Sequence, residues 1–258
     1  MFIAILLAGE RLERNELLEY AHVDAKSLIE LNNKPMILYV LEALLQNSFI
    51  DEIIIIGPRL IVDKCEPIRE LINKNSIKFY EQKKSPALSI LSLFEEIDEN
   101  KKILITTSDN VLLKSEWVDH FCNAAIKSKA DVLMAVNDYN LVKRKYPESK
   151  RTVLKFNDIS LCFCNLFAIM SKRGREAVHV WLKVEALRKK PFKIARMFMP
   201  LWGLFLFLVG ALSSKKAFRM MSKKLNANID IVNMPYPEAC IDVDKIDDLI
   251  LVRKILGT

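Results

Sequence analysis

Histidine and paired cysteine are scarce in this sequence, and each of these shortages excludes a kind of chemistry. Only 3 His and 6 Gly occur among 258 residues, and no Ser-His-Asp or Cys-His arrangement of a nucleophilic enzyme is present. The 5 Cys are odd in number, which predicts reduced thiols in a cytosolic protein rather than a disulfide framework. Cys162 and Cys164 lack a second Cys or His pair, so we expect buried thiols there and no metal site.

The first residues lack the basic start of a secretory signal. Met-Phe-Ile-Ala-Ile-Leu-Leu-Ala-Gly carries no basic side chain, and its apolar run stops at Gly9, so we expect a cytoplasmic protein. With 51% hydrophobic and 28% charged residues, the chain is neither disordered nor collagen-like. Its length suits one large α/β domain or two smaller ones.

The net charge of +7 comes from separate basic clusters at residues 143–145, 150–151, 188–190 and 215–224. Such clusters indicate a solvated surface, a phosphate-rich ligand or an anionic membrane. Aromatic residues are not interleaved with them except beside one apolar segment, so nucleic-acid binding is not expected.

Apolar strands alternate with helical patterns through the first half of the chain. This alternation predicts an α/β fold with a doubly wound, mostly parallel sheet. Ligands of such sheets bind beyond the carboxyl ends of the strands, where Gly9 and Asp109 are expected. Strands are expected at residues 2–7, 52–56, 76–80, 102–106 and 131–136, and helices at 35–45, 62–72, 86–97 and 115–128.

The pattern changes after Asn137. Residues 152–156 and 160–169 predict a hairpin that turns at Asn157-Asp158, and a long helix is expected over 172–189. A late strand at 229–232 and a terminal helix at 246–256 follow. No internal repeat or low-complexity linker divides the chain.

Three polar segments carry candidate chemistry. In Leu7-Ala8-Gly9-Glu10-Arg11, small residues at a strand end let backbone N–H groups approach a phosphate, and Arg11 adds a charge-assisted bond. Lys26 either reaches back to a triphosphate or lies in solvent. Asp109, in Thr107-Ser108-Asp109-Asn110, is either a Mg²⁺ ligand or the N-cap of the next helix.

The order of these segments resembles that of the MobA-like NTP-transferase domain of the nucleotidyltransferase family. The strand followed by Leu7-Ala8-Gly9 and Arg11 matches the opening of the family pattern, and residues 26–36 match its Lys-containing second block. Residues 109–112 match a third block, and residues 242–249 match the closing one. The resemblance covers residues 1–136 and 227–258. It implies a three-layer fold of the nucleotide-diphospho-sugar transferase type, as one domain over residues 1–258.

The resemblance also implies a site. Arg11 and Lys26 would hold the triphosphate and stabilise charge as pyrophosphate leaves. Asp109 and Asp244 would hold Mg²⁺, with Asp242 as the secondary candidate. The nucleotide would contact residues at the first strand end and two serines, namely Leu7, Ala8, Gly9, Glu10, Ser89 and Ser108. The expected reaction is attack of an acceptor phosphate, on a sugar, alcohol or lipid precursor, at the α-phosphate of an NTP.

The family loop has further glycines where this chain has Glu10 and Leu12-Glu13, and a Glu beside a triphosphate repels it unless it points away. Two alternatives therefore stay open. One is a non-catalytic nucleotide-binding or scaffold protein with a decayed site. The other is a glycosyltransferase of the GT-A type, although its usual D-x-D metal motif is replaced by Ser108-Asp109-Asn110. Lys150-Arg151-Thr152 is expected to bind the acceptor phosphate or to form a solvated turn.

Residues 197–214 carry no charge, and basic residues flank them on both sides. A membrane span would separate Asp244 from Gly9 and Asp109, so we expect peripheral docking on the inner face of a membrane. Burial in a helical hairpin and a homodimer interface are the alternatives. We expect residues 172–226 to form a helical apolar and basic insertion in the domain.

Overall fold

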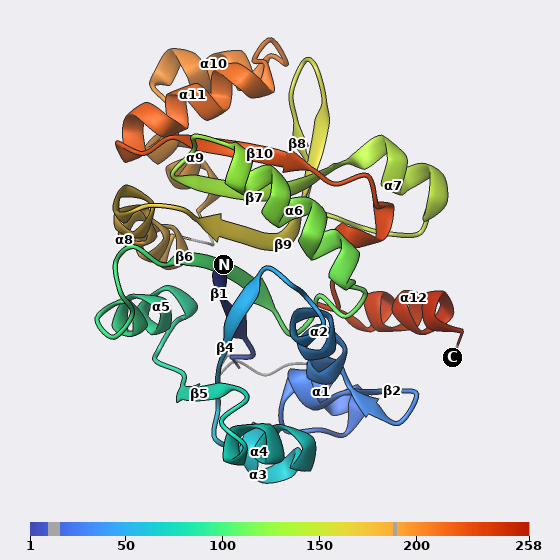
Figure 1. Ribbon diagram of the computed structural model, residues 1–258. Coiled ribbons are helices and arrows are strands. Elements are labelled where there is room, and N and C mark those ends of the chain that lie inside the picture. Colours follow the sequence, from blue (N-terminus) through green and yellow to red (C-terminus); the bar gives the residue numbers. More distant parts are fainter. Residues whose placement is uncertain (10–15, 188–189, 258) are drawn as a thin grey trace.

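A computed structural model describes residues 1–9, 16–187 and 190–257 of the chain. Its main sheet has the strand order β10-β7-β9-β6-β1-β4-β5, with β8 paired to β9 (Figure 1). The strands are β1 Phe2–Leu7, β4 Ile50–Gly57, β5 Lys78–Glu81, β6 Lys102–Thr107, β7 Val132–Asp138, β8 Leu154–Lys155, β9 Ser160–Ile169 and β10 Ile229–Asn233. A separate small hairpin consists of β2 Glu30–Leu31 and β3 Lys34–Pro35.

The pairs β1–β4, β1–β6, β4–β5 and β7–β10 are parallel, whereas β9 is antiparallel to β6 and β7. The predicted mostly parallel α/β sheet is therefore confirmed. The predicted hairpin is present as β8 and β9, although its first strand is only two residues long.

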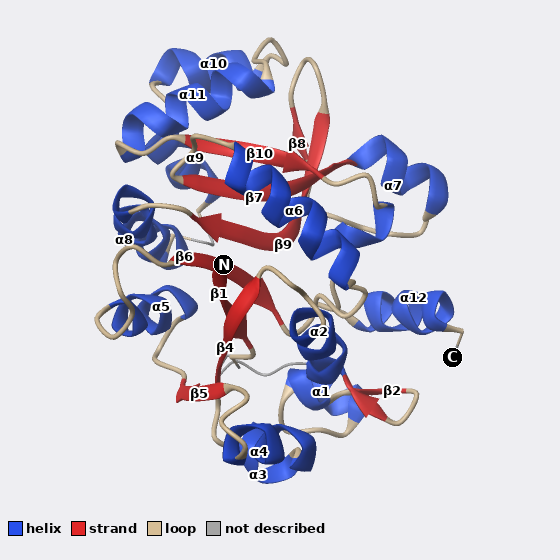
Figure 2. Ribbon diagram, in the orientation of Figure 1, coloured by secondary structure: helices blue, strands red, loops and turns tan. Residues whose placement is uncertain are grey.

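Helices cover both faces of the sheet, which gives the three expected layers (Figure 2). They are α1 Glu16–Ala21, α2 Met36–Leu45, α3 Leu60–Lys64, α4 Glu66–Asn73, α5 Pro86–Phe94, α6 Ser115–Lys127, α7 Tyr139–Lys145, α8 Lys172–Ala186, α9 Pro191–Phe198, α10 Leu201–Leu208, α11 Ser214–Leu225 and α12 Ile246–Leu256. Two 3₁₀ helices, η1 Lys26–Leu28 and η2 Pro237–Cys240, complete the described elements.

Every residue of β1 is buried, because alternate side chains enter two different cores. Phe2, Ala4 and Leu6 pack with α2, α6 and α12, whereas Ile3 and Ile5 pack with α5 and α8. This double burial explains why β1 has a continuous apolar sequence, as central strands of parallel sheets do. It also fixes the end of β1 as a rigid support for whatever follows Leu7.

One expected helix differs from its predicted form for a local reason. The helix expected over 62–72 is two helices, α3 and α4, because Pro67 lacks an N–H group and stands in the first turn of α4. The apolar segment 197–214 is also interrupted, because α10 begins after Pro200 and ends at Leu208. In the part of the chain that the structure describes, no helix combines the length and apolarity needed to cross a bilayer. The five cysteines are free and buried, including Cys162 and Cys164, for which burial was predicted.

Gly174 in α8 allows that helix to approach the start of β7. A Cβ at this position would lie 2.3 Å from the backbone oxygen of Asp131, which cannot move without shifting the strand. We therefore expect Gly174→Ala to lower the free energy of unfolding by about 1–3 kcal/mol, as overpacking does. Urea unfolding checks this, with exposed Glu176→Ala on the same helix as the control; equal stability of both variants contradicts the close contact.

Candidate functional site

Three charged side chains from distant parts of the sequence meet where β1 and β6 end. Lys26 Nζ lies 2.5 Å from Asp109 Oδ2 and 3.0 Å from Asp244 Oδ1. The side chains of Lys26 and Asp109 are 18% and 12% exposed, whereas that of Asp244 is 61% exposed. The cluster is therefore shielded from solvent on the Asp109 side and open to solvent on the Asp244 side.

Backbone hydrogen bonds beyond the strands hold this edge together. The Ser108 N–H donates to Leu7 O over 2.9 Å, and the Ala8 N–H donates to Ile56 O over 2.8 Å. The Val243 N–H donates to Asp109 O over 3.1 Å, which attaches the segment that carries Asp244 to the end of β6. The relative positions of Asp109 and Asp244 are thus set by the main chain as well as by Lys26.

The charge of Lys26 is secured by its surroundings. Burial alone would lower the pKa of this ammonium group, but the nearby carboxylates of Asp109 and Asp244 outweigh burial and raise it well above its ordinary value. Lys26 therefore stays protonated across the physiological range. A fixed positive charge at the end of two parallel strands suits binding of an anionic group such as a phosphate.

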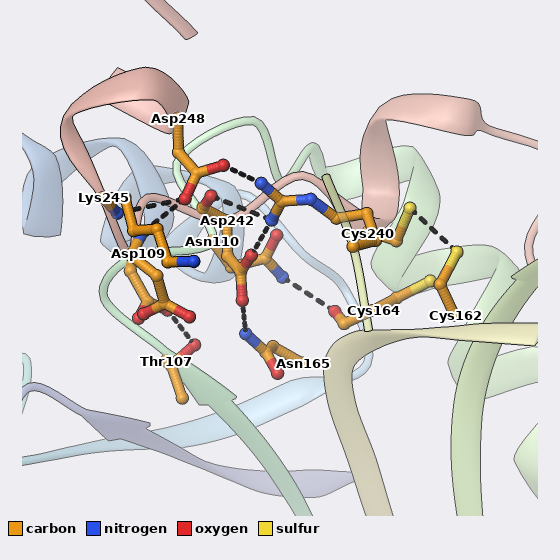
Figure 3. A network of polar contacts seen from close by, with 12 residues as sticks. Thr107, Asp109, Asn110, Cys162, Cys164, Asn165, Cys240, Asp242, Lys245 and Asp248 are labelled. Carbon is orange, nitrogen blue, oxygen red and sulfur yellow. Dashed lines mark hydrogen bonds and ion pairs between the residues drawn. The ribbon is translucent and has the colours of Figure 1, made fainter. Parts of the chain in front are cut away.

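A second set of ion pairs, more buried than the Lys26–Asp244 pair, lies close to Asp109 (Figure 3). The guanidinium group of Arg151, whose side chain is 7% exposed, is paired with the carboxylates of Asp242 and Asp248. Asp248 Oδ2 also accepts the backbone N–H groups of Asp244 and Lys245 over 3.1 and 3.0 Å, at the start of α12. Arg151 thereby supports the turn that presents Asp244.

Asp242 and Asp244 point to different partners, although only one residue separates them. Asp242 contacts Arg151, and its Oδ2 accepts Asn165 Nδ2 over 2.6 Å (Figure 3). Asn165 has a positive φ of 46°, which Asn tolerates better than most residues and which interrupts the β9 pairing. Burial and the charges of Asp109 and Asp244 raise the pKa of Asp242 to about 6. Asp242 therefore lies within the supporting network, and Asp244 faces Lys26.

The glycine at the end of β1 borders the end of β5. A Cβ on Gly9 would lie 2.8 Å from Oε1 at the end of the flexible Gln82 side chain, so Gln82 is the side chain that borders this glycine. Ser89 is buried: its hydroxyl donates to Ser85 O over 3.0 Å and accepts the Lys83 N–H over 2.9 Å. This hydroxyl thus fixes the segment that follows Gln82.

Of the other predicted site residues, three belong to the part of the chain that the structure describes and two do not. Leu7, Ala8 and Ser108 are buried at the carboxyl edge of the sheet, beside the Lys26 cluster. Glu10 and Arg11 lie outside the described residues. Among the described residues, no group of three or more His, Cys, Asp or Glu side chains is arranged to hold a metal ion. The carboxylates available near Lys26 are those of Asp109 and Asp244.

The role of Arg151 differs from the one its sequence context predicts. Solvent exposure is wrong for Arg151, because its side chain is buried and paired with two carboxylates, whereas the Lys150 side chain is 81% exposed. Asn165 and Asp248 were not singled out from the sequence at all. Only the position of Asp248 three residues after Lys245, typical of the first turn of a helix, could have indicated its contact with the backbone.

Comparison with known proteins agrees with the geometry. The sequence model of the MobA-like NTP transferase domain matches residues 4–189. A 2-C-methyl-D-erythritol 4-phosphate cytidylyltransferase from Clostridium beijerinckii is 26% identical over 133 residues, which is 50% of this chain and 56% of that protein. The enzyme of the same name from Clostridium botulinum is 33% identical over 78 residues, 30% of this chain and 32% of its own. The chain thus spans about half or less of the length of these curated relatives.

Solved structures share the fold over nearly the whole chain. A hypothetical transferase from Thermus thermophilus superposes with a TM-score of 0.78 at 23% identity, covering 96% of this chain and 99% of the other. A 4-diphosphocytidyl-2C-methyl-D-erythritol synthase from Anaerococcus prevotii gives a TM-score of 0.59 at 15% identity, covering 100% and 96%. Because the family model matches more than half of the chain, this protein belongs to the MobA-like NTP transferase domain family, within the nucleotidyltransferases.

Proposed function

We propose that this protein transfers a nucleotidyl group from an NTP to a phosphorylated small molecule, with release of pyrophosphate. The observation that carries the proposal is the placement of Lys26 between Asp109 and Asp244 at the carboxyl edge of β1 and β6. In this reaction an oxygen of the acceptor phosphate attacks the α-phosphorus, the bond to the bridging oxygen of the β-phosphate breaks, and pyrophosphate leaves. Such chemistry needs positioning and charge stabilisation and no protein nucleophile.

Each described residue then has a role. Lys26 binds the triphosphate oxygens and stabilises the charge that builds up on the leaving pyrophosphate. Gly9 and Ala8 admit the nucleotide to the end of β1, with Gln82 and the Ser89-supported segment on the β5 side. Ser108 lies buried at the end of β6. Arg11 would add a second positive charge to the triphosphate, and Glu10 would line the nucleotide.

The donor set at this site fits Mg²⁺. Asp109 and Asp244 supply hard oxygen ligands, and Mg²⁺ typically takes one or two carboxylates with phosphate oxygens and water completing its coordination. The two carboxylates already share one cation, the Lys26 ammonium group, so their geometry tolerates a positive charge between them. When bound, the ion would neutralise phosphate charge as a Lewis acid.

The relatives favour CTP as the donor. The two clostridial relatives are cytidylyltransferases, and a CMP:2-keto-3-deoxy-manno-octonic acid synthetase complexed with CTP shares the fold with a TM-score of 0.55 at 12% identity, covering 99% of this chain and 98% of its own. The acceptor is a phosphorylated sugar, alcohol or lipid precursor.

The test is pyrophosphate release by the purified protein with Mg²⁺, each of the four NTPs and a panel of phosphorylated sugars and alcohols. We expect release with one NTP, CTP first, and with one class of acceptor. NTP binding by calorimetry on the same samples separates an untested acceptor from a site that no longer binds nucleotide. Absence of binding for every NTP would contradict the proposal and favour the scaffold alternative; turnover of a nucleotide-sugar instead would favour the glycosyltransferase.

A further inference from the structure

Helix α10 has no polar face. Leu201, Trp202, Phe205, Leu208 and Val209 are 53–68% exposed, at spacings i, i+1, i+4, i+7 and i+8 that place them on one side of the helix. On the other side, Gly203 and Leu204 are buried, and Leu206 and Phe207 pack against Leu212, Ala217 and Met220. A helix that is apolar all round is normally buried all round, so the exposed side of α10 lacks an apolar environment.

The surroundings of this exposed side are strongly basic. Residues 186–229 contain 10 of the 39 Lys and Arg and not one Asp or Glu, whereas in the rest of the chain 29 Lys and Arg are outnumbered by 32 Asp and Glu. The whole positive charge of the protein therefore arises from the region that carries α10. Among the described residues, none of the basic side chains of this region takes part in an ion pair with a carboxylate.

The basic and apolar surfaces adjoin each other. Lys215, Lys216, Arg219 and Lys223 are exposed at positions i, i+1, i+4 and i+8 of α11, and so share one side of that helix. Lys216 Nζ lies 5.2 Å from the ring centroid of Trp202 on α10, so the two sides meet at this contact. Figure 1 shows α10 and α11 lying together beyond β10, the edge strand of the sheet.

The geometry points to a docking surface for an anionic lipid bilayer, formed by the exposed side of α10 and the basic side of α11. Aromatic and aliphatic side chains beside unpaired Lys and Arg are the composition of helices that lie in the membrane interface. Lipid tails would cover Leu201, Phe205 and Leu208, and anionic headgroups would neutralise Lys215 and Lys216. Trp202, with its cation on one face, lies at the boundary, where Trp is enriched in membrane proteins.

The same charges argue against a second copy of the chain as the occupant. A symmetric dimer through α10 would bring two basic regions together, each without a single Asp or Glu. The like charges would repel, and nothing within the region could neutralise them. A bilayer with anionic headgroups supplies both the apolar phase and the opposite charge, and the interaction does not depend on the proposed catalysis.

The test is flotation of the full-length protein with vesicles of pure phosphatidylcholine and with vesicles of equal parts phosphatidylcholine and phosphatidylglycerol. We expect binding to the anionic vesicles at low salt, weaker binding at high salt, and little binding to the neutral ones. Lys215→Gln with Lys216→Gln should weaken partitioning by about 25-fold, at about fivefold for each charge removed. Trp202→Ala with Phe205→Ala should weaken it by about tenfold for each aromatic side chain truncated.

Matched variants on other surfaces serve as controls. Lys127→Gln with Lys129→Gln removes two exposed charges elsewhere, and Leu45→Ala with Ile126→Ala removes exposed apolar area elsewhere. All substituted positions are exposed in these controls, and thermal unfolding verifies the fold of every variant. Absence of binding to anionic vesicles, or equal loss in the controls, would overturn the proposal. So would a dimer in light scattering that Trp202→Ala with Phe205→Ala converts to monomer without any vesicle binding.

Discussion

Replacement of Lys26 by Ala is expected to lower the rate of pyrophosphate release by about two to three orders of magnitude. The size follows from the loss of one preorganised donor to the charge that develops in the transition state. Lys26 is placed for this role because its ammonium group is held 2.5 Å from Asp109 Oδ2 and 3.0 Å from Asp244 Oδ1. Its raised pKa keeps the charge in place across the physiological pH range.

The same variant should also change how the site responds to Mg²⁺. Without the ammonium group, the Asp109 and Asp244 carboxylates repel each other, and bound Mg²⁺ would neutralise that repulsion. We therefore expect added Mg²⁺ to raise the melting temperature of the Lys26→Ala variant by more than that of the wild type. The comparison uses thermal unfolding with Mg²⁺ and without it.

Lys64→Ala is the control for both measurements. Lys64 forms an exposed pair with Asp24, with side chains 52% and 66% exposed, so its removal changes the overall charge equally and leaves the site intact. The Lys64→Ala variant should release pyrophosphate at the wild-type rate. A Lys26→Ala variant that also kept the wild-type rate would contradict the assignment of Lys26 to the reaction.

Replacement of Arg151 by Met is expected to lower the free energy of unfolding by about 3–5 kcal/mol, the usual cost of leaving buried charges without their partner. Asp242 and Asp248 would both lose the guanidinium group, in a place where Arg151 is only 7% exposed. Urea unfolding measures the loss. Lys150→Met is the matched control, because the adjacent Lys150 pairs with Asp247 at 81% and 75% exposure, and such surface pairs contribute about 0–1 kcal/mol.

The loss on Arg151→Met should depend on pH in a defined direction. The pKa of Asp242 is already raised to about 6 in the folded protein, from burial and from the charges of Asp109 and Asp244, and Arg151 opposes this rise. Removing Arg151 raises this pKa further. A folded-state pKa above the unfolded value of 3.8 means that the native state binds the extra proton, so stability falls as the pH rises through the folded pKa. The destabilisation should therefore be smallest below pH of about 6, increase as the pH rises from about 6 towards the raised pKa of the variant, and be largest above that pKa.

Activity measurements on Arg151→Met distinguish a residue that only stabilises the fold from one that also positions Asp244 for Mg²⁺ binding. Arg151 acts on Asp244 through Asp248, which holds the backbone N–H groups of Asp244 and Lys245. We expect the folded fraction of Arg151→Met to need more Mg²⁺ for half-maximal activity, since the turn that presents Asp244 is less well fixed. An unchanged Mg²⁺ requirement would show that Arg151 serves stability alone.

The sequence predicted the fold class and the strands near the site because those strands are buried on both faces. Continuous apolar runs such as Phe2–Leu7 have few alternatives in a chain of this length, and their order fixes which loops share an edge. Lys26, Asp109 and Asp244 could be placed together only because the resemblance to a family connected segments that are far apart in the sequence. Hydrophobic periodicity alone carries no such long-range information.

Other features depend on tertiary contacts that local pattern cannot reveal. Arg151 reads as a surface residue beside Lys150, and only the approach of Asp242 and Asp248 from the end of the chain makes it part of the interior. Asn165 supports Asp242 from an irregular point in β9, where a regular strand was expected. Pro67 indicates the break in the helix expected over 62–72, but the prediction followed the apolar periodicity, which continues across this residue.

The hydrogen bond between the Val243 N–H and Asp109 O also has a consequence for the newborn chain on the ribosome. Synthesis proceeds at about 5–20 residues per second, so Asp244 is joined to the chain roughly 7 to 27 seconds after Asp109. During that interval Lys26 and Asp109 can already approach each other, but the third member of the cluster does not yet exist. The polypeptide therefore cannot assemble its candidate site until residue 244 has been added, and a chain released before that residue would lack it.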